Sequence, residues 1–217
     1  MEKTVLLDRD GIINELIYFP EQGTVDSPFL PDQVKLTPYA VSSINRFHET
    51  GFKVFVISNQ PGMAKAHFDE ATFDSITRRI RELLKQGDAY VDGEYYCFHH
   101  PQGCREKYRM ICSCRKPKPG LILRAARDHG FSIPDTFFIG DGIVDVRAGR
   151  AAGCKTVLVA SVNGFLLRSL AEQNAEPDFI VRTLEEAVRV VERNTSVPHA
   201  ESDRTKPASS SMPDSRP

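Results

Sequence analysis

The chain has 217 residues, with 28 lysine and arginine residues against 29 aspartate and glutamate residues, which leaves a formal net charge of −1. This balance argues against a basic nucleic-acid groove or a polybasic membrane anchor. No apolar run approaches the roughly 20 residues that span a bilayer, and the apolar residues 5–7 near the N-terminus are too few for a signal peptide. We therefore expect a cytoplasmic protein that binds neither nucleic acid nor membrane.

Short apolar segments alternate with helical patterns along most of the chain. In chain order, the apolar segments predict strands at residues 4–7, 53–57, 93–97, 136–139, 155–159 and 179–181. Apolar residues at helical spacing predict helices between Thr37 and Gly51, from Asp69 to Leu84, between Pro119 and Gly130, at 144–152 and at 184–191. Thr37 is predicted as the N-cap of the first helix, with Pro38 as its first residue. This alternation with short connections predicts an α/β fold in which helices flank a parallel sheet.

Two parts of the chain depart from the alternation. Residues 14–36 contain three prolines and are predicted to form a long loop beside the end of the first strand. This loop either lines a ligand pocket or forms a surface segment with a small apolar cluster of its own. Residues 194–217 are rich in serine, proline and charge and are predicted to be a disordered tail. Residues 1–193 would then form the single folded domain.

Polar side chains follow three of the predicted strands directly. They belong to Asp8 and Asp10, to Ser58 and Asn59, and to Asp141, with Asp145 four residues further on. Ligands of open α/β sheets bind beyond the carboxyl ends of the strands, so we expect these groups to converge. Converging carboxylates repel one another unless a cation lies among them, and hard oxygen ligands suit Mg²⁺. A carboxylate beside Mg²⁺ can attack phosphorus, while Ser58, Asn59 and Lys116 could supply a hydroxyl, backbone amides and a cation for the phosphoryl oxygens.

Four of the five cysteines lie in one short stretch, which in a reducing compartment favours a metal site over disulfides. Three thiols and one imidazole in this stretch match a closed tetrahedral zinc site, with the ligands Cys97, His99, Cys112 and Cys114. Such a site leaves no position for water, so we expect a structural role for the loop 97–114. His100 competes with His99 as a ligand, and Cys104 is an unneeded further thiol.

The strand-end motifs resemble those of the haloacid dehalogenase (HAD) superfamily of phosphotransferases. The four motifs of that superfamily are matched in order by Asp8-Arg9-Asp10-Gly11, Ser58-Asn59-Gln60, Lys116 within Arg115-Lys116-Pro117, and Gly140-Asp141 through Asp145. The resemblance covers roughly residues 4–192. It implies a Rossmann-like fold with a zinc-binding loop and no large cap domain.

The resemblance also implies roles for individual residues. Asp8 would be the nucleophile that forms a phospho-aspartate, and Asp10 would protonate the leaving oxygen and then activate water. Mg²⁺ would be held by Asp8, the main-chain carbonyl of Asp10 and the Asp141 carboxylate. The phosphoryl group would be held by Ser58 and Lys116, and Asp145 would orient Lys116 or a metal-bound water.

The zinc loop narrows the resemblance to two related groups of phosphatases, one acting on heptose bisphosphates and one on histidinol phosphate. The length of the loop before Arg115-Lys116-Pro117 is nearer that of the heptose enzymes. The resemblance implies removal of the C7 phosphate of D-glycero-D-manno-heptose 1,7-bisphosphate. We expect a monomer, because the zinc loop and not a large cap domain would cover the site. The planar guanidinium of Arg115 suits the second phosphate of such a substrate. Gly142 departs from the heptose enzymes, in which a lysine is found at this position.

Two alternatives remain open at this stage. One is a phosphatase for histidinol phosphate or another small phosphomonoester. The other is a zinc-stabilised scaffold that binds phosphate without catalysis, against which the presence of Asp8, Asp10 and Asp141 counts.

Overall fold

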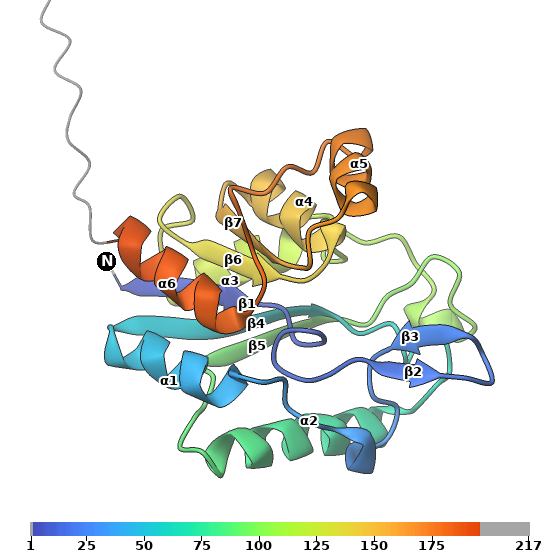
Figure 1. The fold of residues 1–217 in the computed structure, drawn as a ribbon. Helices are drawn as coiled ribbons and strands as arrows, with labels where there is room; N and C mark the ends of the chain where they lie inside the picture. The colour runs from blue at the N-terminus through green and yellow to red at the C-terminus, as the bar shows by residue number, and fades with distance from the viewer. Residues whose placement is uncertain (1, 196–217) are drawn as a thin grey trace, which may run out of the picture.

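A computed structural model describes residues 2–195 of the chain. Its centre is a six-stranded sheet in the order β5-β4-β1-β6-β7-β8 (Figure 1). The strands are β1 (Lys3–Leu7), β4 (Phe52–Asn59), β5 (Gly93–Cys97), β6 (Phe137–Gly140), β7 (Lys155–Val159) and β8 (Phe179–Val181). All five strand pairs are parallel, so the carboxyl ends of the strands share one edge. The predicted α/β fold with a parallel sheet is confirmed.

Helices cover both faces of the sheet (Figure 1). On one face, Val5 and Leu7 of β1 belong to the same apolar core as residues of α1 (Ala40–Glu49), α2 (Glu70–Lys85) and α6 (Leu184–Thr195). On the other face, Leu6 packs in a core with α3 (Gly120–His129) and α4 (Ile143–Ala152). This alternation of side chains along β1 follows from the two-residue period of a strand, and burial on both faces explains its unbroken apolar sequence.

The ends of the helices show where local sequence decides the structure. The carboxylate of Asp69 accepts the amide of Thr72 at 2.8 Å and caps α2 as predicted. Gly130 ends α3 in the left-handed conformation, with φ of 70°. The predicted start of α1 is wrong, because its N-cap is Tyr39. The hydroxyl of Thr37 instead donates to the Ile12 carbonyl at 2.5 Å, which joins this segment to the turn after β1.

Several elements differ from the sequence-based expectation. Residues 14–36 include a small antiparallel hairpin of β2 (Ile17–Phe19) and β3 (Thr24–Asp26), not only a loop. Helix α5 (Gly164–Glu172) was not predicted. Helix α6 continues to Thr195, two residues beyond the predicted domain boundary, and the rest of the predicted tail lies outside the described residues. Within residues 2–195, none of the helices is long and apolar enough to cross a bilayer.

Candidate active site

Three carboxylates meet at the carboxyl edge of the sheet. Asp8 follows β1, Asp141 follows β6, and Asp145 lies in the first turn of α4. One oxygen from each of these carboxylates lies within 4.8 Å of the others. The sequence predicted this convergence of Asp8 and Asp141 from the parallel topology alone.

Gly11 makes this close arrangement possible. Its φ is +82°, a conformation that side chains disfavour, and a Cβ atom placed on it would lie 2.0 Å from Oδ2 of Asp141. The turn after β1 therefore approaches the Asp141 carboxylate so closely that only glycine fits.

Lys116 is the cation of this group. Its Nζ atom lies 2.8 Å from Oδ1 of Asp8 and 2.6 Å from Oδ1 of Asp145, and it donates to the Ile57 carbonyl at 2.9 Å. Burial alone would lower the pKa of Lys116, but the charges of Asp145 and Asp8 outweigh burial and raise this pKa. The ammonium group is therefore held in its charged form against the predicted nucleophile, and the predicted pairing of Asp145 with Lys116 is present.

One lysine does not neutralise three carboxylates. Burial, followed by the charges of Asp8 and Asp145, raises the pKa of Asp141 to about 7. Burial also raises the pKa of Asp8 to about 6, although Lys116 opposes this shift. Such excess negative charge in a buried oxygen-rich site is what a divalent cation relieves, and the donors fit Mg²⁺.

The carboxylate of Asp10 is not part of the trio of carboxylates formed by Asp8, Asp141 and Asp145. It belongs to a neighbouring network of hydrogen bonds. It accepts hydrogen bonds from Arg9, from Nδ2 of Asn14 at 2.9 Å and from Nε2 of Gln60 at 2.5 Å. Arg9 is 1% exposed, with its guanidinium 5.7 Å from the ring centroids of both Phe73 and Tyr96. A buried arginine, paired and covered by aromatic rings, thus fixes the orientation of Asp10.

Ser58 and Asn59 occupy the end of β4 beside Lys116. The Ser58 hydroxyl is buried and accepts Nε2 of Gln60 at 3.1 Å. Both ends of the Asn59 side chain are bound to the main chain of Lys116: Oδ1 accepts its amide at 3.0 Å, and Nδ2 donates to its carbonyl at 3.1 Å. This double contact positions Lys116 and leaves Asn59 fewer groups to offer a ligand.

The four predicted zinc ligands converge at one point. The sulfur atoms of Cys97, Cys112 and Cys114 lie 3.1–3.6 Å apart, and Nδ1 of His99 lies 3.3 Å and 3.7 Å from two of them. Two sulfurs bound tetrahedrally to one zinc ion at 2.3 Å would be about 3.8 Å apart, so the cluster matches a slightly contracted site. His100 is not in the cluster, and Cys104 is exposed.

The pKa values of the thiols in this cluster are shifted in opposite directions. Burial raises the pKa of Cys97. Burial also opposes ionisation of Cys112, but hydrogen bonds from Cys114 and from the Arg115 amide lower its pKa to about 7. A thiol that ionises near neutral pH among three further donors is suited to bind a metal ion.

Arg115 connects this cluster to the carboxylate site. It lies between Cys114 and Lys116 in the chain, and its Nη1 atom donates to the His99 carbonyl at 3.2 Å. The guanidinium is therefore fixed by the loop that carries the four clustered Cys and His side chains.

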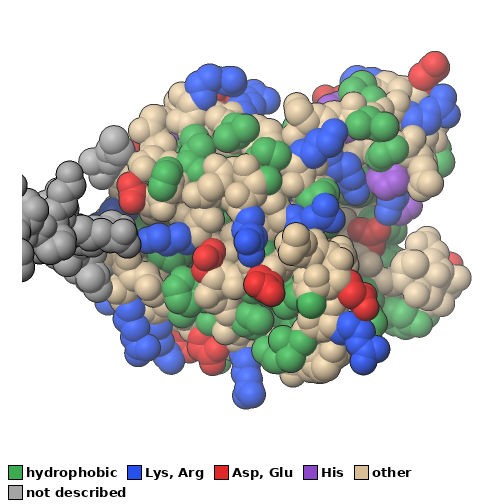
Figure 2. Space-filling model, turned by 90° about the horizontal axis from the view of Figure 1, so that it is seen from above, with side chains coloured by type: hydrophobic (Ala, Val, Ile, Leu, Met, Phe, Trp, Pro, Cys, Tyr) green, Lys and Arg blue, Asp and Glu red, His purple; other side chains and the backbone are tan. Residues whose placement is uncertain are grey.

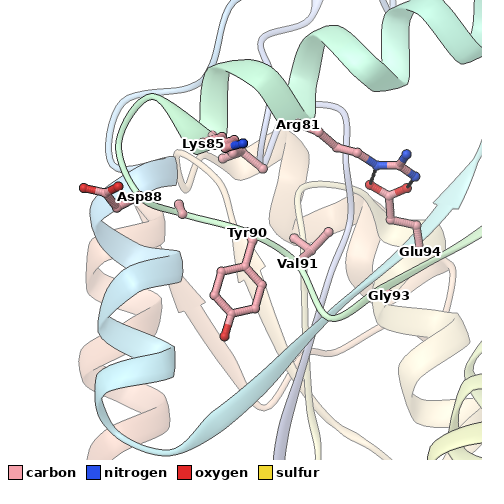
Figure 3. Close-up of a pocket in the computed structure, with 9 residues that line it drawn as sticks. Arg81, Lys85, Asp88, Tyr90, Val91, Gly93 and Glu94 are labelled. Carbon is pink, nitrogen blue, oxygen red and sulfur yellow. Dashed lines mark hydrogen bonds and ion pairs between the residues drawn. The ribbon is translucent and has the colours of Figure 1, made fainter.

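A separate cavity of about 620 Å³ lies at the edge of the sheet, between α2 and the start of β5 (Figure 3). Its polar side chains include Arg81 and Glu94, which form an ion pair with each other. It contains none of the carboxylates of the trio, and we assign no chemistry to it.

The sequence did not identify the network around Asp10. Gln60, Arg9 and Asn14 are fully buried polar side chains, which their sequence context does not reveal. The only signal was their position, because all three lie within or directly beside the motifs that follow β1 and β4.

Comparisons with known proteins define the class of the chain. A family model described as HAD-hydrolase-like matches residues 113–187. A D-glycero-beta-D-manno-heptose-1,7-bisphosphate 7-phosphatase from Escherichia coli strain CFT073 is 35% identical over 153 residues, which cover 70% of this chain and 76% of the relative. The enzyme of the same name from Photorhabdus laumondii is 30% identical over 187 residues, covering 86% and 94%.

A solved structure gives the same result. The D,D-heptose 1,7-bisphosphate phosphatase from B. bronchiseptica, complexed with magnesium and phosphate, aligns with a TM-score of 0.71 and 28% identity over 88% of this chain and 99% of that one. The fold and the matched motifs are those of a HAD-type phosphatase. The chain belongs to the D-glycero-beta-D-manno-heptose-1,7-bisphosphate 7-phosphatase family.

Proposed function

We propose that this chain is a Mg²⁺-dependent phosphatase that removes the C7 phosphate of D-glycero-D-manno-heptose 1,7-bisphosphate through a phospho-aspartate. The observation that carries the proposal is the convergence of Asp8, Asp141 and Asp145 on buried Lys116, in a chain of this family. The names of the relatives specify the beta anomer, which makes this anomer the first substrate to test.

In the first half-reaction, a carboxylate oxygen of Asp8 forms a bond to the C7 phosphorus as the bond to the C7 oxygen breaks. Asp10 supplies a proton to that oxygen, so the sugar leaves as the alcohol heptose 1-phosphate. Lys116 and Ser58 hold the phosphoryl oxygens, and Asn59 and Asp145 hold Lys116 in place.

In the second half-reaction, Asp10 accepts a proton from a water molecule that attacks the phosphorus of phospho-Asp8. The bond between phosphorus and the aspartyl oxygen breaks, which releases inorganic phosphate and restores the Asp8 carboxylate. The hydrogen bonds from Asn14 and Gln60 keep Asp10 directed for both transfers. Mg²⁺, held by Asp8, the main-chain carbonyl of Asp10 and Asp141, would neutralise charge on the phosphoryl group.

The Cys97, His99, Cys112 and Cys114 cluster is proposed as a structural zinc site. It has four protein donors, which closes a tetrahedral shell and leaves no position for a reacting water. Its contribution would be to fix Arg115 and Lys116, which follow the last ligand directly. The cytoplasmic location and the monomeric state stay predictions from the sequence.

Phosphate release from both anomers of the bisphosphate, from histidinol phosphate and from fructose 1,6-bisphosphate tests the proposal. We expect the heptose bisphosphate to be preferred by a large factor in kcat/KM, with no turnover without Mg²⁺. Asp8→Asn keeps the size of the side chain and should abolish release from every substrate. Equal or reversed preference for histidinol phosphate would refute the substrate assignment, and wild-type turnover by Asp8→Asn would refute the mechanism.

A further inference from the structure

Three loops meet beside the carboxylate site. They are residues 14–36, which include the β2–β3 hairpin, residues 61–68 after β4, and the Cys/His loop after β5. The Arg105 amide donates to the Ala64 carbonyl at 3.1 Å, and the rings of Phe29 and His67 lie 4.4 Å apart. In Figure 2, lysine, arginine and histidine side chains flank a recess on this side of the molecule, with acidic side chains deeper in it. The rim of the site is thus built from contacts among all three loops.

Lys65 lies where these loops join. The turn that carries it is fixed by two hydrogen bonds, from the Lys65 amide to the Pro61 carbonyl and from the His67 amide to the Gly62 carbonyl, each at 2.9 Å. The next residue, Ala66, has φ of 61°, a left-handed conformation that is unfavourable for alanine. A strained residue that hydrogen bonds hold in place indicates that the fold fixes this turn, and the turn sets the position of Lys65.

The Lys65 side chain has one carboxylate partner among the described residues. Its Nζ atom lies 3.6 Å from Oδ2 of Asp26 in the hairpin, and both side chains are partly exposed. An ion pair of this length, open to water, is weak and easily exchanged.

Positive groups outnumber this one carboxylate at the rim. The guanidinium of Arg115 donates to the His99 carbonyl at 3.2 Å. The next residue, His100, accepts the Gly103 amide at 3.0 Å, and Gly103 packs against Ala64, which directly precedes Lys65. Among the described residues, Asp26 is the carboxylate within 4 Å of Lys65, and none lies within 4 Å of Arg115. An anionic ligand would neutralise this excess positive charge.

We propose that Lys65 determines specificity by binding, beside Arg115, the phosphate of the substrate that is not cleaved. On binding, Lys65 would exchange the Asp26 carboxylate for that phosphate. The proposal rests on the proposed function, because only a bisphosphate presents a second phosphate while the first is at Asp8. The same contact would hold the heptose 1-phosphate product and cause product inhibition.

The test compares kcat/KM for heptose 1,7-bisphosphate and for heptose 7-phosphate, which lacks the second phosphate. Lys65→Gln should lower the bisphosphate-to-monophosphate ratio about tenfold, the size expected for one partly exposed charged hydrogen bond, and should weaken inhibition by heptose 1-phosphate to a similar extent. Lys65→Arg should restore most of the ratio. The matched control is Lys107→Gln, which removes the same charge from an exposed position on the Cys/His loop.

Asp26→Asn tests the exchange of partners. Removing the competing carboxylate should lower KM for the bisphosphate, whereas a raised KM would show that the ion pair only braces the hairpin and would overturn the exchange. A Lys65→Gln ratio equal to that of wild type, or an equal loss on both substrates, would overturn the specificity role while leaving the proposed function intact. If the wild-type protein hydrolyses neither heptose phosphate, the proposed function fails and this inference fails with it.

Discussion

Replacing Gly11 by alanine should separate the free-energy cost of its left-handed backbone conformation from the cost of crowding Asp141, the proposed Mg²⁺ ligand. The added Cβ would lie 2.0 Å from Oδ2 of Asp141, well inside van der Waals contact, so the carboxylate or the turn must move by more than about 1 Å. Displacements of this size at a catalytic group commonly cost about 100-fold in rate. We therefore expect kcat/KM to fall at least about 100-fold and the apparent affinity for Mg²⁺ to fall with it.

Gly51 provides a closely matched control. Its φ is +81°, against +82° for Gly11, and a Cβ placed on it meets no atom within 4 Å. Gly51→Ala should therefore show the backbone cost alone, about 1–2 kcal/mol, or a fall of several degrees in Tm for a domain of this size. Both variants should lose this stability, and only Gly11→Ala should lose activity.

The measurements are a thermal melt of each variant with and without Mg²⁺ and a Mg²⁺ titration of phosphate release. If Gly11→Ala and Gly51→Ala show the same Mg²⁺ dependence and the same kcat/KM, the close approach of the first turn to Asp141 does not control the site. That result would refute the reasoning from the geometry of the trio.

Three further outcomes are expected. The pKa values of Asp8 and Asp141 are raised to about 6 and about 7, so the metal-free fold binds protons at these two carboxylates more tightly than the unfolded chain does. The stability that this proton binding contributes is complete below pH about 4 and is lost as the pH rises through the two raised pKa values. Mg²⁺ binds the ionised form, so the gain in Tm on adding Mg²⁺ should grow between a pH below 6 and one above 7, and a gain independent of pH would contradict this. Metal analysis should find about one zinc ion per chain. The Cys114→Ser variant should lose both the zinc and the activity, whereas Cys104→Ser, at an exposed position, should keep both. If a zinc-free Cys114→Ser protein stayed active, the metal would have no role in positioning Arg115 and Lys116. Gln60→Ala removes the side chain that donates to Asp10 and Ser58. It should lower kcat about 10- to 100-fold and lower the free energy of unfolding by about 1–3 kcal/mol. An unchanged kcat would show that Asp10 does not need the hydrogen bond from Gln60.

The sequence was most informative where a single physical rule decides the structure. Strand β7 was predicted at its observed bounds, and Asp8 and Asp141 were placed together because strand ends meet at one edge of a parallel sheet. The convergence of the four Cys/His side chains was predicted because thiols and an imidazole clustered at this spacing indicate a metal site in a reducing compartment.

Features that depend on tertiary contacts were not predicted. The hairpin strands have only three residues each and little burial, so their pattern is too short to read. Helix α5 directs Leu170 inward but leaves Phe165 81% exposed, which obscures its periodicity. The environment of Arg9 could not be predicted either, because a charged residue is expected at the surface and becomes buried only when Asp10 and Gln60 pair with it.

The Cys/His loop is anchored at both of its ends by the cluster of four side chains, and between them it contacts Ala64 and Glu70. Cys97 is the last residue of β5, and a single residue separates Cys114 from Lys116, so one cluster of side chains holds both ends of the loop. Insertions or deletions between Cys97 and Cys114 would change the shape of the loop beside the proposed substrate site without moving Lys116, which contacts Asp8. A protein with this arrangement can change its substrate specificity while its catalytic residues stay in place.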